Sequence, residues 1–171
     1  MIIRELRNED AIPPITALLH AAYSPLARMG LRFLATHQDD ATTLERFQLG
    51  SGYVAEIDGA IVGTITHSPP ATESDCAYYL SPGVFAFRQF GVHPEYQRRG
   101  IGLLLLKFIE QKARDCGASE LALDTAEGAL HLRQWYERCG FRCVGHVSWH
   151  DTNYRSVVLS KTLSAAGRIP A

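Results

Sequence analysis

Apolar residues recur along the chain with two different periods, and these periods predict the order of its strands and helices. Alternating or short apolar segments predict strands over residues 2–6, 52–57, 60–66, 84–92, 120–125, 143–150 and 154–163. Apolar positions spaced by three or four residues predict helices over residues 12–22, 42–49, 101–117 and 129–140. Asp58-Gly59, between two of these strands, is a strong hairpin signal.

The resulting order, β α α β β β α β α β β, predicts an α/β (α+β) fold. A Rossmann sheet would need regular alternation of strands and helices, which the hairpins interrupt. We therefore expect a mixed, mostly antiparallel central sheet flanked by helices, in one domain that covers residues 1–163. Residues 164–171 are expected to form a loosely ordered C-terminal tail.

The first helix has a recognisable start but no clear end. Asp10 is expected to cap its N-terminus, and Pro13 is tolerated in the first turn because the N–H it lacks would be unpaired there. The apolar face stops near Ala22. Pro25 and Gly30 then leave residues 23–39 without an assigned structure.

Two glycines stand where the helix over residues 101–117 begins. Each costs roughly 1 kcal/mol of helix propensity relative to alanine. The rest of the helix has a coherent apolar face, which we expect to be buried and which consists of Ile101, Leu104, Leu105, Phe108 and Ile109. The apolar pattern accounts for the leucines but leaves Gly100 and Gly102 unexplained.

Bare backbone at a helix N-terminus attracts anions, because unpaired N–H groups and the positive end of the helix dipole lie there. Arg98 and Arg99 add charge of the matching sign. One interpretation is a phosphate or pyrophosphate bound over residues 98–103, and the other is a tight strand-to-helix turn that needs glycine. The sequence lacks the Gly-Lys-Ser/Thr of a P-loop, and Leu105 stands where a dinucleotide fingerprint needs its third glycine.

The surroundings of this junction favour the anion site. The segment FGVHPEYQRRGIG over residues 90–102 resembles the acetyl-CoA signature of the GNAT N-acetyltransferase superfamily. Downstream, WYERCGF resembles a second hallmark of that family, a tyrosine four residues before a Gly-Phe pair. The close resemblance covers residues 84–141, and the predicted element order is also that of the GNAT fold.

The resemblance implies where acetyl-CoA, the co-substrate, would bind. The backbone of Phe90, Gly91 and Val92 would pair with the pantetheine arm, and Gly91 suits a β-bulge there. The pyrophosphate would lie on Arg98, Arg99, Gly100, Ile101, Gly102 and Leu103. Many family members carry an asparagine seven residues before the tyrosine, and Ala129 occupies that position here.

The family reaction is a direct attack of an amine on the acetyl thioester, and the resemblance assigns residues to its proton transfers. Tyr136 matches the tyrosine that donates a proton to the departing thiolate. Asp124, at the end of the central strand, corresponds to a carboxylate base in some members. Glu56, His67 and a water relay are alternatives for the base.

Composition excludes several classes of function and adds no further chemistry. A formal net charge of −1 over 171 residues gives no reason to expect nucleic acid as a partner. No apolar run reaches the roughly 20 residues of a membrane helix, and the first residues do not resemble a signal peptide, so a cytoplasmic protein is expected. Four cysteines in a chain of this length do not form a disulfide scaffold.

No metal site is expected either. Cys139, Cys143, His146 and His150 are the obvious ligand types. Along one strand, however, Cys143 and the two histidines point to opposite faces, and Cys139 belongs to the preceding helix.

Two functions remain open from the sequence: an acetyl-CoA-dependent N-acetyltransferase acting on a primary amine, and an acyl-CoA-binding or sensing module with little or no catalysis. Tyr136 favours the enzyme, and Ala129 favours the module. We expect the amine acceptor to bind between residues 20–50 and the last hairpin. The sequence identifies neither the acceptor nor a homodimer, although dimers are common in the family.

Overall fold

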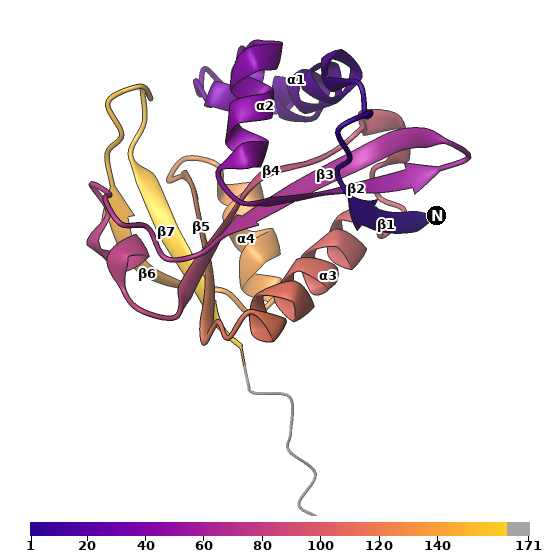
Figure 1. The fold of residues 1–171 in the computed structure, drawn as a ribbon. Helices are drawn as coiled ribbons and strands as arrows, with labels where there is room; N and C mark the ends of the chain where they lie inside the picture. Colours follow the sequence, from indigo (N-terminus) through magenta and orange to yellow (C-terminus); the bar gives the residue numbers. More distant parts are fainter. Residues whose placement is uncertain (164–171) are drawn as a thin grey trace, which may run out of the picture.

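The seven strands and four helices follow the predicted order (Figure 1). A computed structural model describes residues 1–163, so the tail expected over residues 164–171 lies outside the described residues. The elements are β1 (Ile2–Glu5), α1 (Ile12–Arg28), α2 (Asp40–Gln48), β2 (Ser51–Ile57), β3 (Ala60–Ser68), β4 (Val84–Val92), α3 (Ile101–Asp115), β5 (Glu120–Ala126), α4 (Leu130–Arg138), β6 (Arg142–Val147) and β7 (Ser156–Thr162).

One sheet contains all the strands, in the order β1-β2-β3-β4-β5-β7-β6. Every neighbouring pair is antiparallel except β4 and β5, which confirms the mostly antiparallel sheet. α1 and α2 lie on one side of the sheet, and α3 and α4 lie on the other (Figure 1). No helix within residues 1–163 has both the length and the apolarity to cross a membrane.

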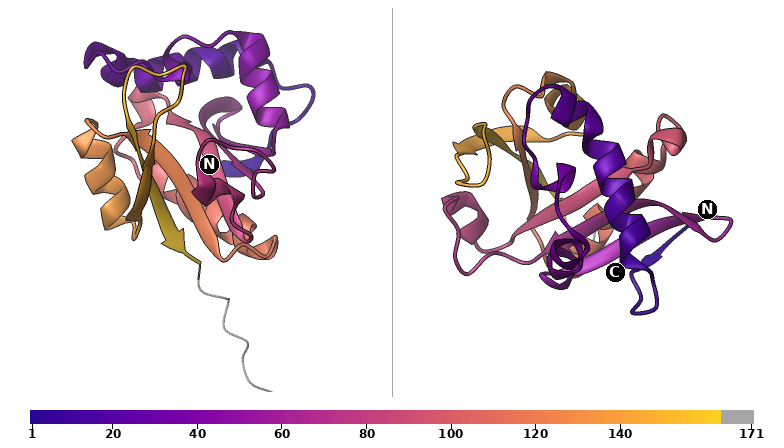
Figure 2. Two further views of the ribbon diagram at one scale, coloured as in Figure 1. Left: turned by 90° about the vertical axis from the view of Figure 1, so that its left-hand side faces the viewer. Right: turned by 90° about the horizontal axis from the view of Figure 1, so that it is seen from above.

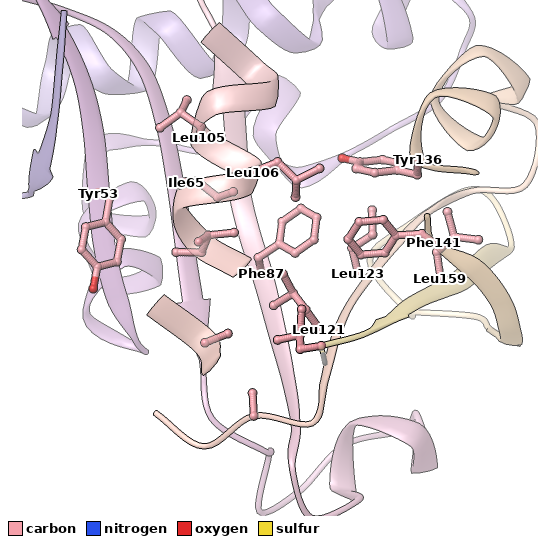
Figure 3. Close-up of a cluster of buried hydrophobic side chains, with 14 of the residues drawn as sticks. Tyr53, Ile65, Phe87, Leu105, Leu106, Leu121, Leu123, Tyr136, Phe141 and Leu159 are labelled. Atoms are coloured by element: carbon pink, nitrogen blue, oxygen red, sulfur yellow. The ribbon is translucent and has the colours of Figure 1, made fainter. Parts of the chain in front are cut away.

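The largest core lies between the sheet and the two helices α3 and α4. Figure 3 shows aromatic and leucine side chains from both halves of the sheet meeting there. Tyr136 of α4 packs against Phe87 of β4 and Phe141, with ring centroids 6.1 and 5.7 Å away. This core therefore joins the two halves of the sheet and holds α4 in place.

α1 is longer than its apolar pattern predicts, and its cap is different. It continues through Pro25 to Arg28, because the Ser24 hydroxyl donates a hydrogen bond (3.0 Å) to the Ala21 carbonyl that Pro25 cannot pair. Asp10 does not cap the helix, so that prediction was wrong. Its carboxylate instead accepts hydrogen bonds of 2.7 and 2.8 Å from the Arg4 guanidinium.

The predicted buried face of α3 was partly wrong. Ile101, Leu105 and Ile109 are buried as expected, but Leu104 is 46% exposed and Leu106 is fully buried. The charged residue Glu110 is buried as well. It forms an ion pair with Lys161 of β7 at 2.7 Å. Leu106 packs in the main core and Glu110 pairs with Lys161, so tertiary partners set the face that the helix buries.

The connection between β6 and β7 reaches across the molecule to α1 (Figure 2). β6 ends at Val147, earlier than the predicted strand. Beyond it, Asn153 accepts a hydrogen bond from the Arg32 backbone N–H (2.8 Å) and donates one to the Gly30 carbonyl (2.7 Å). The hairpin loop is thereby tied to the segment between α1 and α2.

The corrected face of α3 generates a stability prediction. Leu106→Ala should lower the free energy of unfolding by about 2–5 kcal/mol, because it leaves a cavity in the core. Leu104→Ala should lower it by no more than about 0.5 kcal/mol, because surface substitutions have small effects. Urea unfolding of both variants measures the difference. Equal losses in the two variants would contradict this orientation of the helix.

Candidate active site

β4 and β5 pair over only three residues and then separate. Val84–Ala86 lie in register with Glu120–Ala122. Beyond that point, β4 continues beside β3 as far as Val92, and β5 continues beside β7 as far as Ala126. The second half of β4 consequently has an open edge, and it contains the residues to which the resemblance assigns the pantetheine arm.

A β-bulge interrupts β4 at this open edge. Thr66 pairs with Arg88 and Thr64 pairs with Gly91, so β4 holds one extra residue between these pairs. Gln89 has a φ of +49°, whereas Gly91 does not have a positive φ. The bulge therefore involves Gln89 and Phe90, and its predicted position at Gly91 was wrong.

Gly91 has a packing role instead. A Cβ atom there would lie 3.2 Å from Cβ of Ala22 and 3.4 Å from Cδ2 of Leu19, both on α1. The absence of a side chain allows α1 to approach the sheet beside the bulge.

A buried polar network holds the bulge in its left-handed conformation. The Gln89 amide donates to the Thr43 carbonyl (3.2 Å), and its oxygen accepts from the Gln38 amide (3.1 Å). Gln38 also donates to the Thr43 hydroxyl (2.7 Å), and the Thr64 hydroxyl donates to the Gln89 carbonyl. The network joins β3, β4 and α2, so the open edge is rigidly placed relative to the helices above it.

Backbone N–H groups are unpaired where α3 begins. The N–H groups of residues 98–103 form no hydrogen bond with any part of the chain that the structure describes, and the first helical bond runs from Leu104 N–H to the Gly100 carbonyl. Gly100 has no capping side chain. These six amides are the predicted pyrophosphate contacts, and they lie at the N-terminus of a 15-residue helix.

The two glycines have different reasons to be there. Gly100 has a φ of +81°, a conformation that glycine adopts easily, so the turn itself requires it. Gly102 has no such backbone, and a Cβ atom on it would meet nothing closer than 3.7 Å. Neither packing nor backbone geometry explains Gly102, and its role in the close approach of a pyrophosphate stays a prediction.

Tyr136 places a phenol beside the open edge of β4. Its ring lies among Phe87, Trp135 and Phe141, and its oxygen points from α4 toward Leu106 of α3 (Figure 3). Burial raises the pKa of Tyr136 well above its usual value. A phenol in this setting stays protonated and can act as a proton donor.

A cavity of about 260 Å³ runs from Tyr136 through the gap between the strands to the opposite face of the sheet. This volume is near the lower end of small-molecule sites, which are roughly 300–1,000 Å³. Its lining comes from α1, α2, β4, β5, α4 and the β6–β7 loop, and includes Tyr23, Phe33, Arg46, Arg88, Phe90, Asp124, Leu132, Trp149, Asp151 and Tyr154. We expected the acceptor to bind between residues 20–50 and the last hairpin, and residues from both segments line this cavity.

Asp124 lies on the other face of the sheet from Tyr136. Its neighbour Leu123 packs in the same core as Tyr136, whereas the Asp124 carboxylate accepts hydrogen bonds from the Tyr79 hydroxyl (3.0 Å) and Trp149 Nε1 (2.8 Å). These donors fix the carboxylate at the cavity. A carboxylate has about four acceptor positions, so two stay available to another group.

The other candidate bases are not at the cavity. Glu56 forms an ion pair with Arg4 at 2.8 Å. His67 stacks on Tyr53 in the core beneath α3, where burial lowers the pKa of its imidazole. Within residues 1–163, no group of three or more His, Cys, Asp and Glu side chains is arranged to hold a metal ion.

The position of the bulge has a signal in the sequence. Arg88 and Gln89 are consecutive polar residues inside an otherwise apolar strand, and consecutive polar residues break the alternation of a regular strand. Arg46, Tyr23 and Trp149 give no comparable signal, because only the folded chain brings their segments together.

Comparison with known proteins places this site in a family. The model of the acetyltransferase (GNAT) family matches residues 16–141. The chain is 34% identical to S-(2-succino)cysteine N-acetyltransferase of Bacillus subtilis over 122 residues, covering 70% of this chain and 72% of the relative. It is 32% identical to S-alkylcysteine N-acetyltransferase of the same organism over 143 residues, covering 82% and 78%.

Solved structures share the fold at low sequence identity. A GNAT acetyltransferase from Elizabethkingia anophelis, with acetyl-CoA bound, superposes with a TM-score of 0.67 at 18% identity, covering 95% of this chain and 97% of the other. The ribosomal-protein-S18-alanine N-acetyltransferase from Escherichia coli gives 0.71 at 16% identity, covering 99% and 98%. The two relatives in Bacillus subtilis are both named as enzymes, which favours an enzyme over a binding module.

The unpaired amides of α3 generate a binding prediction. Gly102→Val should weaken the binding of acetyl-CoA at least tenfold, about 1.4 kcal/mol, because the side chain would stand between the amides and the pyrophosphate. The chain should still fold, since a Cβ atom there meets only ordinary contacts. Calorimetric titration with acetyl-CoA measures the affinity, and a thermal melt checks the fold.

Gly145→Val is the matched control. Gly145 lies in β6, without a positive φ, and a Cβ atom there would meet nothing within 4 Å. This variant should bind acetyl-CoA as the wild type does. An unchanged affinity in Gly102→Val would mean that the junction is only a turn.

Proposed function

The chain belongs to the GNAT acetyltransferase family and is an acyltransferase, and we propose that it transfers the acetyl group of acetyl-CoA to a primary amine by direct attack on the thioester. One observation carries the proposal: the cavity connects the open edge of β4 with a carboxylate and a phenol on opposite faces of the sheet. The gap lets a thioester and an amine meet from opposite sides.

The open edge and the start of α3 would hold the cofactor. In the proposal, the pyrophosphate accepts hydrogen bonds from the amides of residues 98–103, and the backbone of Phe90, Gly91 and Val92 lies along the pantetheine arm. The His93 N–H donates to Val62 of β3 (2.8 Å), so the neighbouring Val92 carbonyl faces the open side. There it accepts a hydrogen bond of 3.0 Å from the Gln97 side chain. Pantetheine would share or replace that bond.

The reaction needs proton transfers on both sides of the gap. We assign Asp124 to accept the proton that the amine loses, because its fixed carboxylate lines the acceptor side. The neutral amine nitrogen then forms its bond to the acetyl carbon, the carbon–sulfur bond breaks, and the second proton that the nitrogen must lose passes to water. Tyr136 gives its proton to the departing thiolate, and positioning of the two reactants supplies much of the remaining rate.

The acceptor is an amine on a small molecule in this proposal, since the cavity has room for little more. The two relatives from Bacillus subtilis are named for S-substituted cysteines, which carry one primary amine. S-substituted cysteines are therefore the first acceptors to test.

Tyr136→Phe tests the acid. It should lower kcat by roughly 100-fold or more, while the dissociation constant for acetyl-CoA stays within about twofold, because only the proton donor is lost. Release of free CoA thiol with S-substituted cysteines and other amines measures kcat. Tyr53→Phe changes another buried core tyrosine outside the cavity, and it should keep the wild-type rate.

The pH profile gives a second readout of Tyr136. Its raised pKa keeps the phenol protonated above its ordinary pKa of about 10, so wild-type kcat should not decline on the alkaline side up to about pH 10. If Tyr136→Phe has the same kcat as the wild type, the phenol is not the proton donor.

Asp124→Asn tests the carboxylate. An amide cannot take the proton of an ammonium, so kcat/KM for the amine should fall roughly 100-fold or more at neutral pH and recover partly at higher pH, where more amine is neutral. An amide also accepts fewer hydrogen bonds than a carboxylate, so the free energy of unfolding should fall by about 1 kcal/mol. An unchanged kcat/KM at every pH would assign the base to water or another group.

A further inference from the structure

Arg46 is a cation without a partner inside the cavity. It lies on α2, and its Nε atom is buried without a hydrogen-bond acceptor. Within residues 1–163 its guanidinium forms no ion pair. Burial lowers the pKa of Arg46 and the nearby Arg88 lowers it further, while the charges of Asp124 and Asp151 act in the opposite direction. An unpaired charge in such a place is costly, and a bound anion would offset that cost.

Other partly buried arginines of this chain have carboxylate partners. Arg4 forms ion pairs with Asp10 and Glu56 at 2.7 and 2.8 Å. Arg142 pairs with Glu120 at 3.0 Å. Arg133 has a buried, unpartnered Nε as well, but its guanidinium donates to the Glu127 carbonyl (3.1 Å), whereas Arg46 lies in the cavity.

Arg88 adds a second cation next to the reacting centre. It lies on β4 immediately before the bulge, on the same face of the sheet as Asp124 of β5, and it too forms no ion pair within the described residues. The lining thus places positive charge on α2 and β4, and negative charge on β5 and at Asp151 of the β6–β7 loop, around one small space. This arrangement is complementary to a molecule that carries an ammonium and a carboxylate close together.

We propose that Arg46 and Arg88 bind the carboxylate of an amino-acid acceptor, whose amine lies at Asp124. Two guanidinium groups can hold a carboxylate through charge-assisted hydrogen bonds, and this would fix the acceptor with its nitrogen toward the gap. The inference rests on the proposed function, because it orients the amine for attack on the thioester.

Aromatic residues form another part of the cavity wall, and they suit the side chain of an amino-acid acceptor. Tyr23, Phe33 and Tyr154 lie together, with ring centroids of successive pairs 5.6 and 4.7 Å apart. This aromatic surface suits an apolar side chain. The acceptor class is therefore an α-amino acid with an extended apolar side chain, rather than a simple amine or a polyamine.

The test compares a carboxylate with its neutral counterpart in the same acceptor. S-benzyl-L-cysteine and S-benzyl-L-cysteinamide differ at the carboxylate alone, and both carry an aromatic group for the wall. Wild-type protein should acetylate the acid with a kcat/KM at least about 100-fold above that of the amide, because an unfilled polar site strongly rejects the analogue.

Arg46→Gln and Arg88→Gln should each reduce that preference to less than about tenfold, because kcat/KM falls far more for the acid than for the amide. Arg28→Gln removes an exposed arginine at the end of α1, outside the cavity, and should leave the preference intact. A wild type with no preference, or variants that lose both substrates equally, would overturn the inference and leave the acetyltransferase function in place.

Calorimetric binding of the same two compounds to the CoA-saturated protein tests the carboxylate site without turnover. The acid should bind at least tenfold more tightly than the amide to the wild type, and the difference should vanish in Arg46→Gln. Carboxylate-dependent binding without acetylation of any amine would support the site and refute the proposed function. The absence of both would overturn both.

Discussion

The separation of β4 from β5 after three paired residues is the constraint on which the rest of the structure depends. A sheet paired along its whole length would place a continuous barrier between the phenol of Tyr136 and the carboxylate of Asp124. The separation opens a passage between the faces and leaves one edge of β4 unpaired. Most of the sheet tolerates this because β3 and β7 continue to pair with the outer edges of the two strands, and the core under α3 and α4 joins both halves.

The bulge and its hydrogen-bond network fix the position at which the two strands separate. Gln89, held by Gln38 and Thr43, turns β4 away at a fixed position and connects that position to α2. α2 also carries Arg46, so the element that supports the bulge shapes the acceptor side of the cavity as well. On the proposed cofactor side, a Cβ atom on Gly102 would be in ordinary contact with Phe90 and Val92, so the start of α3 lies against the same strand. Cofactor and acceptor would therefore be positioned by one short stretch of backbone.

Sequence motifs supplied candidates for the cofactor side of the site and few for the acceptor side, and the difference is physical. The amides of residues 98–103 and Tyr136 lie in local motifs, so residue spacing and glycine positions identify them as candidates. The order of elements followed from periodicity for the same reason. Arg46, Arg88 and Trp149 come from three separate segments, and nothing local shows that they share a cavity. The misplaced bulge, the cap at Asp10 and the face of α3 failed because tertiary partners, not local propensity, decided them.

A crystal structure of the protein with acetyl-CoA tests the central claim most directly, that the gap between β4 and β5 is the place of acetyl transfer. The account predicts pyrophosphate oxygens within hydrogen-bond distance of the amides of residues 98–103, and the thioester in the gap, near the Tyr136 hydroxyl. The acetyl group should point toward Asp124, Arg46 and Arg88. A cofactor bound elsewhere, with the strand gap filled by side chains or the acetyl group outside the cavity, would contradict it.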